Sequence, residues 1–176
     1  MKTEYMLEKE VELVLHLLTY ENRLLARLLL HTGLRVGDAL ALKTEQLKPN
    51  FWITEQKTGK RRQVGIPAPL LDDLKAAAGE IWVFPGADPR KPRTRQALWK
   101  DVKRAAKAAR LNQNVAPHSL RKVYAVELLN KYGDIERVRR ALNHGGMEVT
   151  LIYAMADRQL AEAGRRRRRG SGRPKA

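Results

Sequence analysis

The feature that most constrains this chain is an apolar helical pattern cut short by a glycine. Residues 20–31 contain the run NRLLARLLL, which has leucines at helical spacing, and Gly33 follows as a residue that can end a helix. Arg35 stands directly after this stop, and apolar residues resume behind it. A buried guanidinium is costly unless it is paired. Either Asp38 pairs with Arg35 for structural reasons, or Arg35 is held ready for an anion.

The rest of the chain is predicted to be mainly α with one small sheet, an α+β fold class. Short β-prone pieces, separated by Pro-Asn and Lys-Thr-Gly-Lys turn signals, predict three antiparallel strands over residues 45–48, 51–55 and 62–66. Apolar periodicity and end signals predict the helices. They are expected over residues 5–18, 20–31, 36–42, 69–78, 94–110, 117–131, 135–142 and 147–163.

Charge points to the kind of partner. The chain has 35 basic and 19 acidic residues, a net charge of +16. The segment 164–176 carries seven positive charges and no acidic residue, and the body remains basic without it. We expect this tail to be disordered when free. Solubility alone would explain a basic surface, but an excess of this size favours a polyanionic partner, above all nucleic acid.

Composition also excludes several classes of protein. The chain contains no cysteine, which rules out disulfides and cysteine-based metal sites. No apolar run approaches the roughly 18 residues of a membrane span, and the N-terminal MKTEYMLEKE is too acidic for a signal peptide. We therefore expect a cytoplasmic protein without a membrane partner.

Several polar residues stand where they could carry chemistry, although each pattern alone has a plainer explanation. His118 and Arg121 share one face of a helix near its N-terminus, which suits a phosphate, but a capping histidine and a solvated arginine are commoner there. Lys57 lies in a hairpin turn, where lysines are usually solvated. His144 follows a helix as a cap would, and Tyr153 lies in an apolar segment as a core tyrosine would.

Taken in chain order, these residues resemble the catalytic domain of the tyrosine recombinases, the phage integrase family, over residues 20–155. The matching set is Arg35, Lys57, His118, Arg121, His144 and Tyr153. The resemblance implies the catalytic-domain fold of that family over residues 1–163, without the N-terminal core-binding domain that members usually carry, followed by the basic tail 164–176. The expected activity is site-specific cleavage and rejoining of DNA strands.

The resemblance also implies a role for each residue. Tyr153 would attack a phosphodiester and form a covalent 3′-phosphotyrosine. Arg35 and Arg121 would clamp the phosphate with donors whose charge does not titrate away. Lys57 would act as general acid for the leaving 5′-oxygen, and His118 as acid/base near the nucleophile.

The remaining implied roles are supporting ones. His144 would hydrogen-bond the phosphate, and Asp38 would orient Arg35. No metal ion, ATP or other cofactor is expected, because the arginines replace a divalent cation and the phosphotyrosine conserves the bond energy.

The partners implied are double-stranded DNA, further copies of the chain in a tetrameric synapse, and accessory DNA-bending proteins. Basic residues of the helix 94–110 and of the tail are expected to contact the DNA backbone. These are Lys100, Lys103, Arg104, Lys107, Arg165, Arg166 and Arg167.

Three other functions remain open from sequence. A type IB topoisomerase would use similar chemistry without strand exchange. A recombinase relative that has lost catalysis, or that lacks the DNA clamp, would bind DNA without cleaving it. A basic RNA-binding module would not require a tyrosine at position 153.

Overall fold

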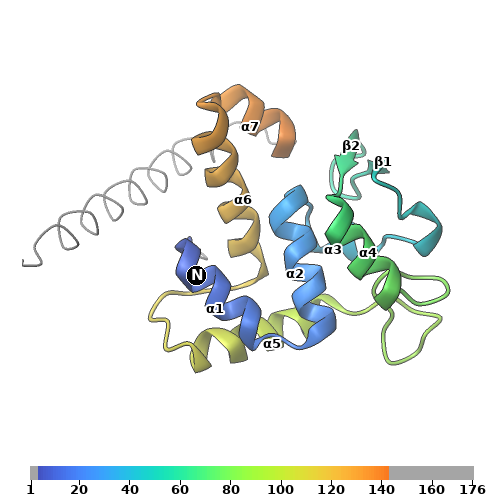
Figure 1. Ribbon diagram of the computed structural model, residues 1–176, viewed down its shortest axis with the longest axis horizontal. Coiled ribbons are helices and arrows are strands. Elements are labelled where there is room, and N and C mark those ends of the chain that lie inside the picture. The colour runs from blue at the N-terminus through green and yellow to red at the C-terminus, as the bar shows by residue number, and fades with distance from the viewer. Residues whose placement is uncertain (1–3, 143–176) are drawn as a thin grey trace, which may run out of the picture. The chain divides into compact units, whose positions relative to one another are not determined.

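The computed structural model describes residues 4–142. The chain divides into two compact units, and the boundary falls between Tyr124 and Ala125 inside one helix. The elements in chain order (Figure 1) are α1 Glu8–Leu17, α2 Tyr20–Thr32, α3 Val36–Leu40, η1 Thr44–Gln46, β1 Asn50–Thr54, β2 Arg61–Gly65, α4 Ala68–Ala77, α5 Arg95–Ala108, α6 Pro117–Tyr132 and α7 Ile135–Leu142. The predicted α+β class is confirmed.

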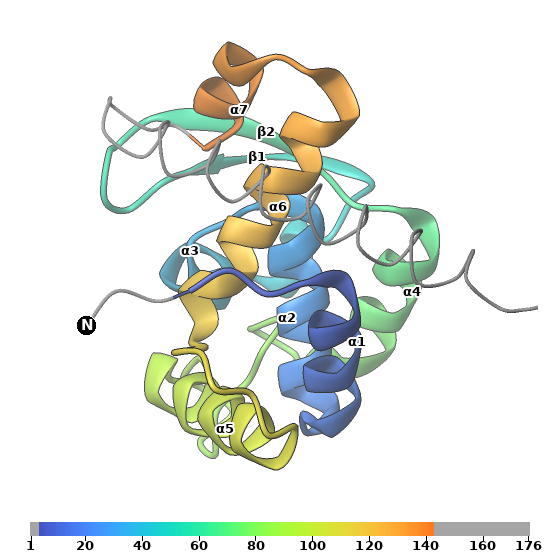
Figure 2. The same ribbon diagram turned by 90° about the vertical axis from the view of Figure 1, so that its left-hand side faces the viewer.

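Helix α2 forms the centre of the first unit. Its leucines are buried around much of the helix, with Leu25 and Leu28 completely inaccessible to solvent. Helices α1, α3 and α4 each pack against α2, and α5 packs against α1 and α3. Figure 2 shows α1 beside α2, with α5 at their lower end. Burial of each such leucine contributes about 1.5–3 kcal/mol, so the run predicted from its spacing holds the unit together.

The N-terminus of α2 is capped by a carboxylate from another helix. Asp101 of α5 is buried, and its Oδ2 accepts hydrogen bonds from the Thr19 amide (3.0 Å), the Thr19 hydroxyl (2.9 Å) and the Asn22 side-chain amide (2.8 Å). Its Oδ1 accepts from Arg104 at 2.6 Å. A negative charge at a helix N-terminus is favourable because unpaired N–H groups and the helix dipole both point to it. One ionised group therefore joins segments far apart in the sequence.

We predict that Asp101→Ala lowers the free energy of unfolding by about 2–4 kcal/mol, because the buried Asn22 side chain and the partly buried amide and hydroxyl of Thr19 lose their acceptor. Urea denaturation at neutral pH measures the change. Asp72→Ala, at an exposed position of α4, is the matched control and should cost less than about 0.5 kcal/mol. Equal losses in the two variants would contradict the capping role.

The sheet has two strands, not the three predicted. Strands β1 and β2 pair antiparallel from Asn50 opposite Gly65 to Thr54 opposite Arg61, within one residue of the expected positions. The piece predicted over residues 45–48 lies instead in and after the 3₁₀ turn η1.

Local hydrogen bonds explain the missing strand. The Gln46 side chain accepts the amide of Lys43 at 2.9 Å, and the Leu47 amide bonds back to Thr44. The backbone around the start of η1 pairs with residues 81–83 instead. The Thr44 amide donates to the Ile81 carbonyl, and the Val83 amide donates to the Leu42 carbonyl. The backbone of this segment is therefore hydrogen-bonded outside the sheet.

The second unit begins at Ala125, and its described part contains the end of α6 and all of α7. Gly133 adopts a left-handed conformation, with φ of 66°, and its amide bonds back to Leu129. Asp134 then caps α7 by accepting the amides of Glu136 (2.8 Å) and Arg137 (3.2 Å). The predicted helix over 135–142 is confirmed. None of the helices within residues 4–142 is long and apolar enough to cross a membrane.

Candidate active site

The backbone turn between α2 and α3 forms the base of the candidate site. Gly33 ends α2 in the left-handed conformation, with φ of 60° and ψ of 22°, and its amide donates to the Leu29 carbonyl at 2.8 Å. The expected C-cap is confirmed. The chain then reverses so that Leu34 is buried and Arg35 becomes the N-cap residue of α3. The turn thus places a guanidinium at the boundary of the core, with the Arg35 side chain one-fifth exposed.

A second arginine reaches the same turn from α6. Arg121 is buried, and its Nη1 donates to the Gly33 carbonyl. His118 precedes Arg121 by one helical turn and is exposed at the start of α6. The ring of Tyr124, one turn further on, occupies the space that a side chain at position 33 would need. The structure therefore brings Arg35 and Arg121 to one turn and leaves His118 open to solvent on the helix that carries Arg121.

We predict that Gly33→Ala destabilises the fold by about 3 kcal/mol, because it adds a left-handed residue with a Cβ, which costs about 1–2 kcal/mol, and a collision with Tyr124. Gly59→Ala is the control, since Gly59 also has a positive φ, of 65°, but has open space around the added carbon. Thermal or urea unfolding should show the smaller loss for Gly59. Equal losses would mean that the tyrosine contact contributes nothing.

The carboxylate that holds Arg35 belongs to Glu55, a residue not predicted as part of the site. Glu55 follows β1 and is fully buried, and its Oε2 accepts from Arg35 Nη1 and from the Thr58 hydroxyl at 3.0 Å. Its Oε1 lies 3.5 Å from Nε of Arg62 on β2. Arg62 in turn donates through Nη2 to the Thr32 carbonyl at 2.7 Å. One carboxylate is thus enclosed by two guanidiniums and a hydroxyl.

This enclosure keeps Glu55 ionised. Burial by itself raises the pKa of the Glu55 carboxyl, but the hydrogen bonds from Arg35 and Thr58 and the charges of Arg35 and Arg62 outweigh it, so the pKa lies below its usual range. Burial also lowers the pKa of the Arg62 guanidinium, while nearby Tyr124, Glu55 and Asp38 raise it. An ionised carboxylate between two arginines is the electrostatic centre of the site.

We predict that Glu55 makes the fold sensitive to acid. Its folded-state pKa is lowered, so the stability that it contributes is fully present above the unfolded pKa, about 4.3, and is lost as the pH falls through the lower folded pKa. Urea unfolding between pH 6 and pH 3 should therefore show a shallower loss of stability in Glu55→Gln than in the wild type. Identical slopes would contradict the assignment.

Asp38 has a different partner from the one expected. It was predicted to orient Arg35, but its Oδ1 accepts the main-chain amide of Gln56 at 2.9 Å, and Arg35 pairs with Glu55. Asp38 lies in the first turn of α3, and its buried carboxylate is directed to the end of β1. It therefore supports the turn that follows β1, next to the residue that holds Arg35.

Lys57 lies in that turn. The amide of Glu55 donates to the Lys60 carbonyl at 3.0 Å, and the Gly59 amide donates to the Glu55 carbonyl at 2.8 Å, so the turn closes on Glu55. Lys57 is exposed between these bonds. The predicted hairpin position of Lys57 is confirmed, and the lysine stands two residues from the carboxylate that holds Arg35.

Among the basic residues of α5 expected at DNA, Arg104 has protein partners. Its guanidinium pairs with Asp101 at 2.6 Å and donates to the Leu17 carbonyl at 2.6 Å. These bonds connect α5 with the end of α1 and with the cap of α2. These protein contacts explain why an arginine stands at position 104 without a contact to DNA.

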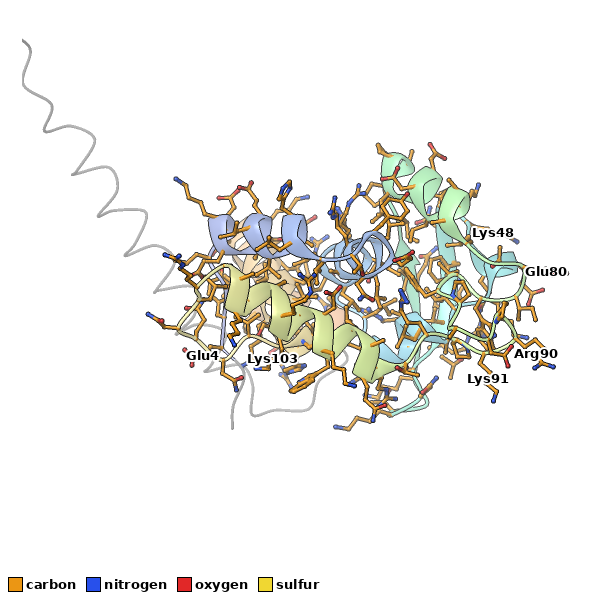
Figure 3. The ribbon with its side chains drawn as sticks, turned by 90° about the horizontal axis from the view of Figure 1, so that it is seen from below. Glu4, Lys48, Glu80, Arg90, Lys91 and Lys103 are labelled. Atoms are coloured by element: carbon orange, nitrogen blue, oxygen red, sulfur yellow. The ribbon has the colours of Figure 1, made fainter. Side chains whose placement is uncertain are left out.

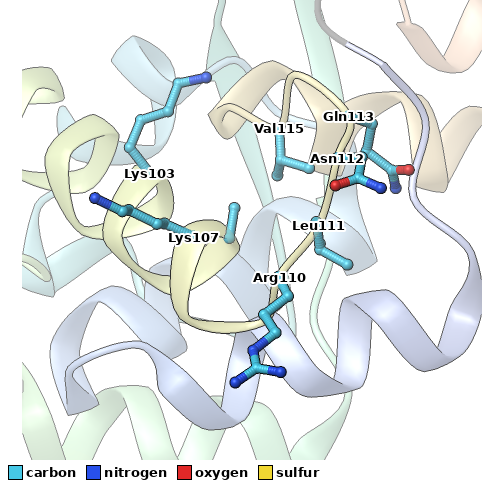
Figure 4. Close-up of a pocket in the computed structure, with 8 residues that line it drawn as sticks. Lys103, Lys107, Arg110, Leu111, Asn112, Gln113 and Val115 are labelled. Atoms are coloured by element: carbon cyan, nitrogen blue, oxygen red, sulfur yellow. The ribbon is translucent and has the colours of Figure 1, made fainter.

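Two of the three lysines of α5 are exposed, and Lys103 is half-buried. Lys103 donates to the Asn114 side chain at 2.5 Å and lies over the exposed ring of Trp99 at 5.8 Å from the centroid. Figure 3 shows Lys103 on the side of α5 seen from below. Lys103 and Lys107 line a shallow pocket together with Arg110 (Figure 4). Lys100 is exposed. Contact of Lys100, Lys103 and Lys107 with a DNA backbone stays a prediction.

The remaining predicted residues lie outside the described part of the chain. They are His144, Tyr153, Arg165, Arg166 and Arg167. Within residues 4–142 no group of three histidine, aspartate or glutamate side chains is placed to hold a metal ion. The described portion of the site contains Arg35, Lys57, His118 and Arg121, with the buried carboxylates of Glu55 and Asp38 beside them.

Comparison with known proteins assigns the family. The phage integrase family matches residues 4–159. The chain is 28% identical to the probable integrase/recombinase YoeC of Bacillus subtilis, over 76% of this chain and 77% of that protein. It is 34% identical to the integrase of Escherichia phage P2 (87% of this chain, 43% of that protein) and 32% identical to the tyrosine recombinase XerD of Ralstonia nicotianae (78% and 49%). The chain spans less than half the length of the latter two relatives.

Solved structures agree with this assignment. XerH recombinase bound to a palindromic difH substrate superposes with a TM-score of 0.69 at 25% identity, covering 91% of this chain and 52% of that one. A lambda integrase dimer bound to a COC′ core site has a TM-score of 0.72 at 21% identity, covering 86% and 48%, and supports the fold. The chain belongs to the phage integrase family, and the expected fold is that of a tyrosine recombinase catalytic domain.

Proposed function

We propose that this chain is the catalytic domain of a site-specific DNA recombinase that cleaves and rejoins strands through a covalent 3′-phosphotyrosine. The observation that carries the proposal is the meeting of Arg35 and Arg121 at the Gly33 turn, beside the turn that bears Lys57. Two guanidiniums, with a lysine in the adjoining turn, suit a phosphodiester, whose transition state gains charge on its non-bridging oxygens. Membership in the phage integrase family supports the same function.

The residues divide the cleavage step among them. The Tyr153 oxygen attacks phosphorus and forms a P–O bond, and the bond from phosphorus to the 5′-oxygen breaks. His118 takes the tyrosine proton, and Lys57 gives a proton to the 5′-oxygen, which leaves as a hydroxyl. Arg35 and Arg121 bind the non-bridging oxygens throughout, because guanidinium keeps its charge at any relevant pH.

Rejoining reverses these steps. A 5′-hydroxyl attacks the phosphotyrosine and loses its proton to Lys57, the bond from phosphorus to the Tyr153 oxygen breaks, and His118 returns a proton to that oxygen. His144 donates a hydrogen bond to the phosphate. The number of phosphoester bonds is unchanged, so no ATP is required. The two guanidiniums supply the positive charge that a divalent cation supplies in other phosphoryl-transfer sites, so we expect cleavage to proceed in EDTA.

The proposal extends to partners. The net charge of +16 suits the backbone of double-stranded DNA, with Lys100, Lys103, Lys107 and the basic tail 164–176 as candidate phosphate contacts. Self-association on DNA is supported by a neighbour of the same fold, since lambda integrase forms a tetramer bound to a Holliday junction (TM-score 0.70). The match to a phage P2 integrase supports an origin in a mobile element. Accessory DNA-bending proteins remain part of the proposal without a surface assigned to them.

The deciding experiment is covalent trapping. We expect the protein, incubated in EDTA with nicked duplexes of randomised sequence, to form a protein–DNA adduct that survives a denaturing gel. The nick lets the cleaved end diffuse away, so the adduct accumulates. Tyr153→Phe lacks the attacking oxygen and should form none. Sequencing of the trapped DNA would define the site.

Other outcomes exclude the proposal in different ways. An adduct in both proteins would mean that another residue is the nucleophile. DNA binding without an adduct in either protein would favour the alternative of a relative that binds DNA and lacks catalysis. Relaxation of any supercoiled plasmid, with no preferred site, would favour a topoisomerase.

A further inference from the structure

The buried carboxylate of Glu55 has no part in the chemistry described above, although it contacts two segments of the site. Its side chain is fully buried, while the residues on both sides of it, Thr54 and Gln56, are exposed. A carboxylate is almost never buried without partners, because desolvation disfavours its charge. Its position therefore requires an explanation in terms of what it holds.

The contacts of Glu55 join an arginine to a turn. Oε2 receives hydrogen bonds from Arg35, which precedes α3, and from Thr58, which directly follows Lys57. The main-chain amide and carbonyl of Glu55 close the same turn through Lys60 and Gly59. A single oxygen thus fixes both the guanidinium assigned to the phosphate and the backbone that carries the assigned general acid.

The charged side chains around Glu55 leave a net positive charge, which suits an anion. Arg35, Arg62 and Arg121 bring three positive charges to this region, and Glu55 and Asp38 bring two negative ones. Glu55 separates Arg35 from Arg62, which would repel each other without it. The described site keeps a net positive charge for a phosphate, and Arg35 stays in one orientation before that phosphate arrives.

We propose that Glu55 is a positioning residue that couples the orientation of Arg35 to the placement of Lys57. This inference rests on the function proposed above. Glu55 itself touches neither DNA nor the reacting atoms. It acts through Arg35 on phosphate binding, and through Thr58 on proton transfer to the leaving oxygen.

The two effects can be separated with two DNA substrates. Both are nicked duplexes with the sequence recovered by trapping, and they differ only in the 5′-bridging atom of the cleaved phosphate, oxygen or sulfur. An alkoxide needs a proton from Lys57 to leave, whereas a thiol has a pKa of about 8.5 and its thiolate leaves without one. A defect in proton transfer is therefore relieved by sulfur, and a defect in phosphate binding is not.

For Glu55→Gln we expect cleavage of the oxygen substrate to slow by about 100-fold, and cleavage of the sulfur substrate by only about 10-fold, the part due to Arg35. Asp101→Asn is the matched control, because it also removes a buried, arginine-paired carboxylate, away from this site. At a temperature where both variants are folded, Asp101→Asn should stay within about twofold of the wild type on both substrates. A wild-type rate in Glu55→Gln, or an equal loss on the two substrates, would overturn the coupling.

Thr58 gives a test that does not depend on how well Glu55→Gln folds. Thr58 is exposed, so Thr58→Val removes the hydroxyl with little effect on the core. We expect it to slow cleavage of the oxygen substrate by about 10-fold and to leave the sulfur substrate unaffected. Thr58→Ser keeps the hydroxyl and should restore the rate.

Two results would overturn the inference here. One is an equal loss for Thr58→Val on both substrates, or no loss on either. The other is a wild-type protein that forms no adduct, which would overturn the proposed function and this inference with it. In the first case the wild type still forms an adduct, so only the role of Glu55 is overturned.

Discussion

The left-handed turn at Gly33 is the constraint on which the rest of the site depends. Its φ of 60° ends α2 and turns the chain into α3, so Arg35 leaves the core at a fixed point. The carbonyl of Gly33 accepts Arg121, and the carbonyl of Thr32 accepts Arg62. Carbonyls at a helix C-terminus have no intrahelical partner, so here they are satisfied by guanidiniums. The end of one helix thereby gathers arginines from α6 and β2.

The buried charges hold one another in place more than they add net stability. A buried ion pair contributes little net stability, because desolvation offsets its attraction, yet removal of one partner costs several kcal/mol. Glu55 is held in this way between Arg35 and Arg62. The arrangement fixes each guanidinium in one direction, so under the proposed function the site would not need to reorient its dipoles when a phosphate enters. Asp101 differs from Glu55, because its buried carboxylate caps the N-terminus of α2 and contacts none of the predicted site residues Arg35, Lys57, His118 and Arg121.

Most of the fold could be predicted from local patterns, and the errors have physical causes. The helices and the hairpin follow apolar spacing, Gly33 and the Lys-Thr-Gly-Lys turn. The third strand failed because Gln46 bonds to the backbone of Lys43 and favours a 3₁₀ turn over the β-propensity of that segment. Glu55 was missed because a glutamate among polar neighbours at the end of a strand looks solvated. Its burial results from Arg35, twenty positions away in the chain.

The sequence by itself determined the helical leucine pattern, the stop at Gly33, the basic charge and the residue types that match a recombinase site, because each depends on residues close in the chain or on their order. Only the tertiary structure decided which carboxylate pairs with Arg35, and that Asp38 bonds to Gln56. It also decided that Arg104 is held by Asp101 and Leu17. These pairings depend on how the helices and the hairpin pack, which brings Glu55 to Arg35 and directs the buried Asp38 carboxylate to the Gln56 amide instead.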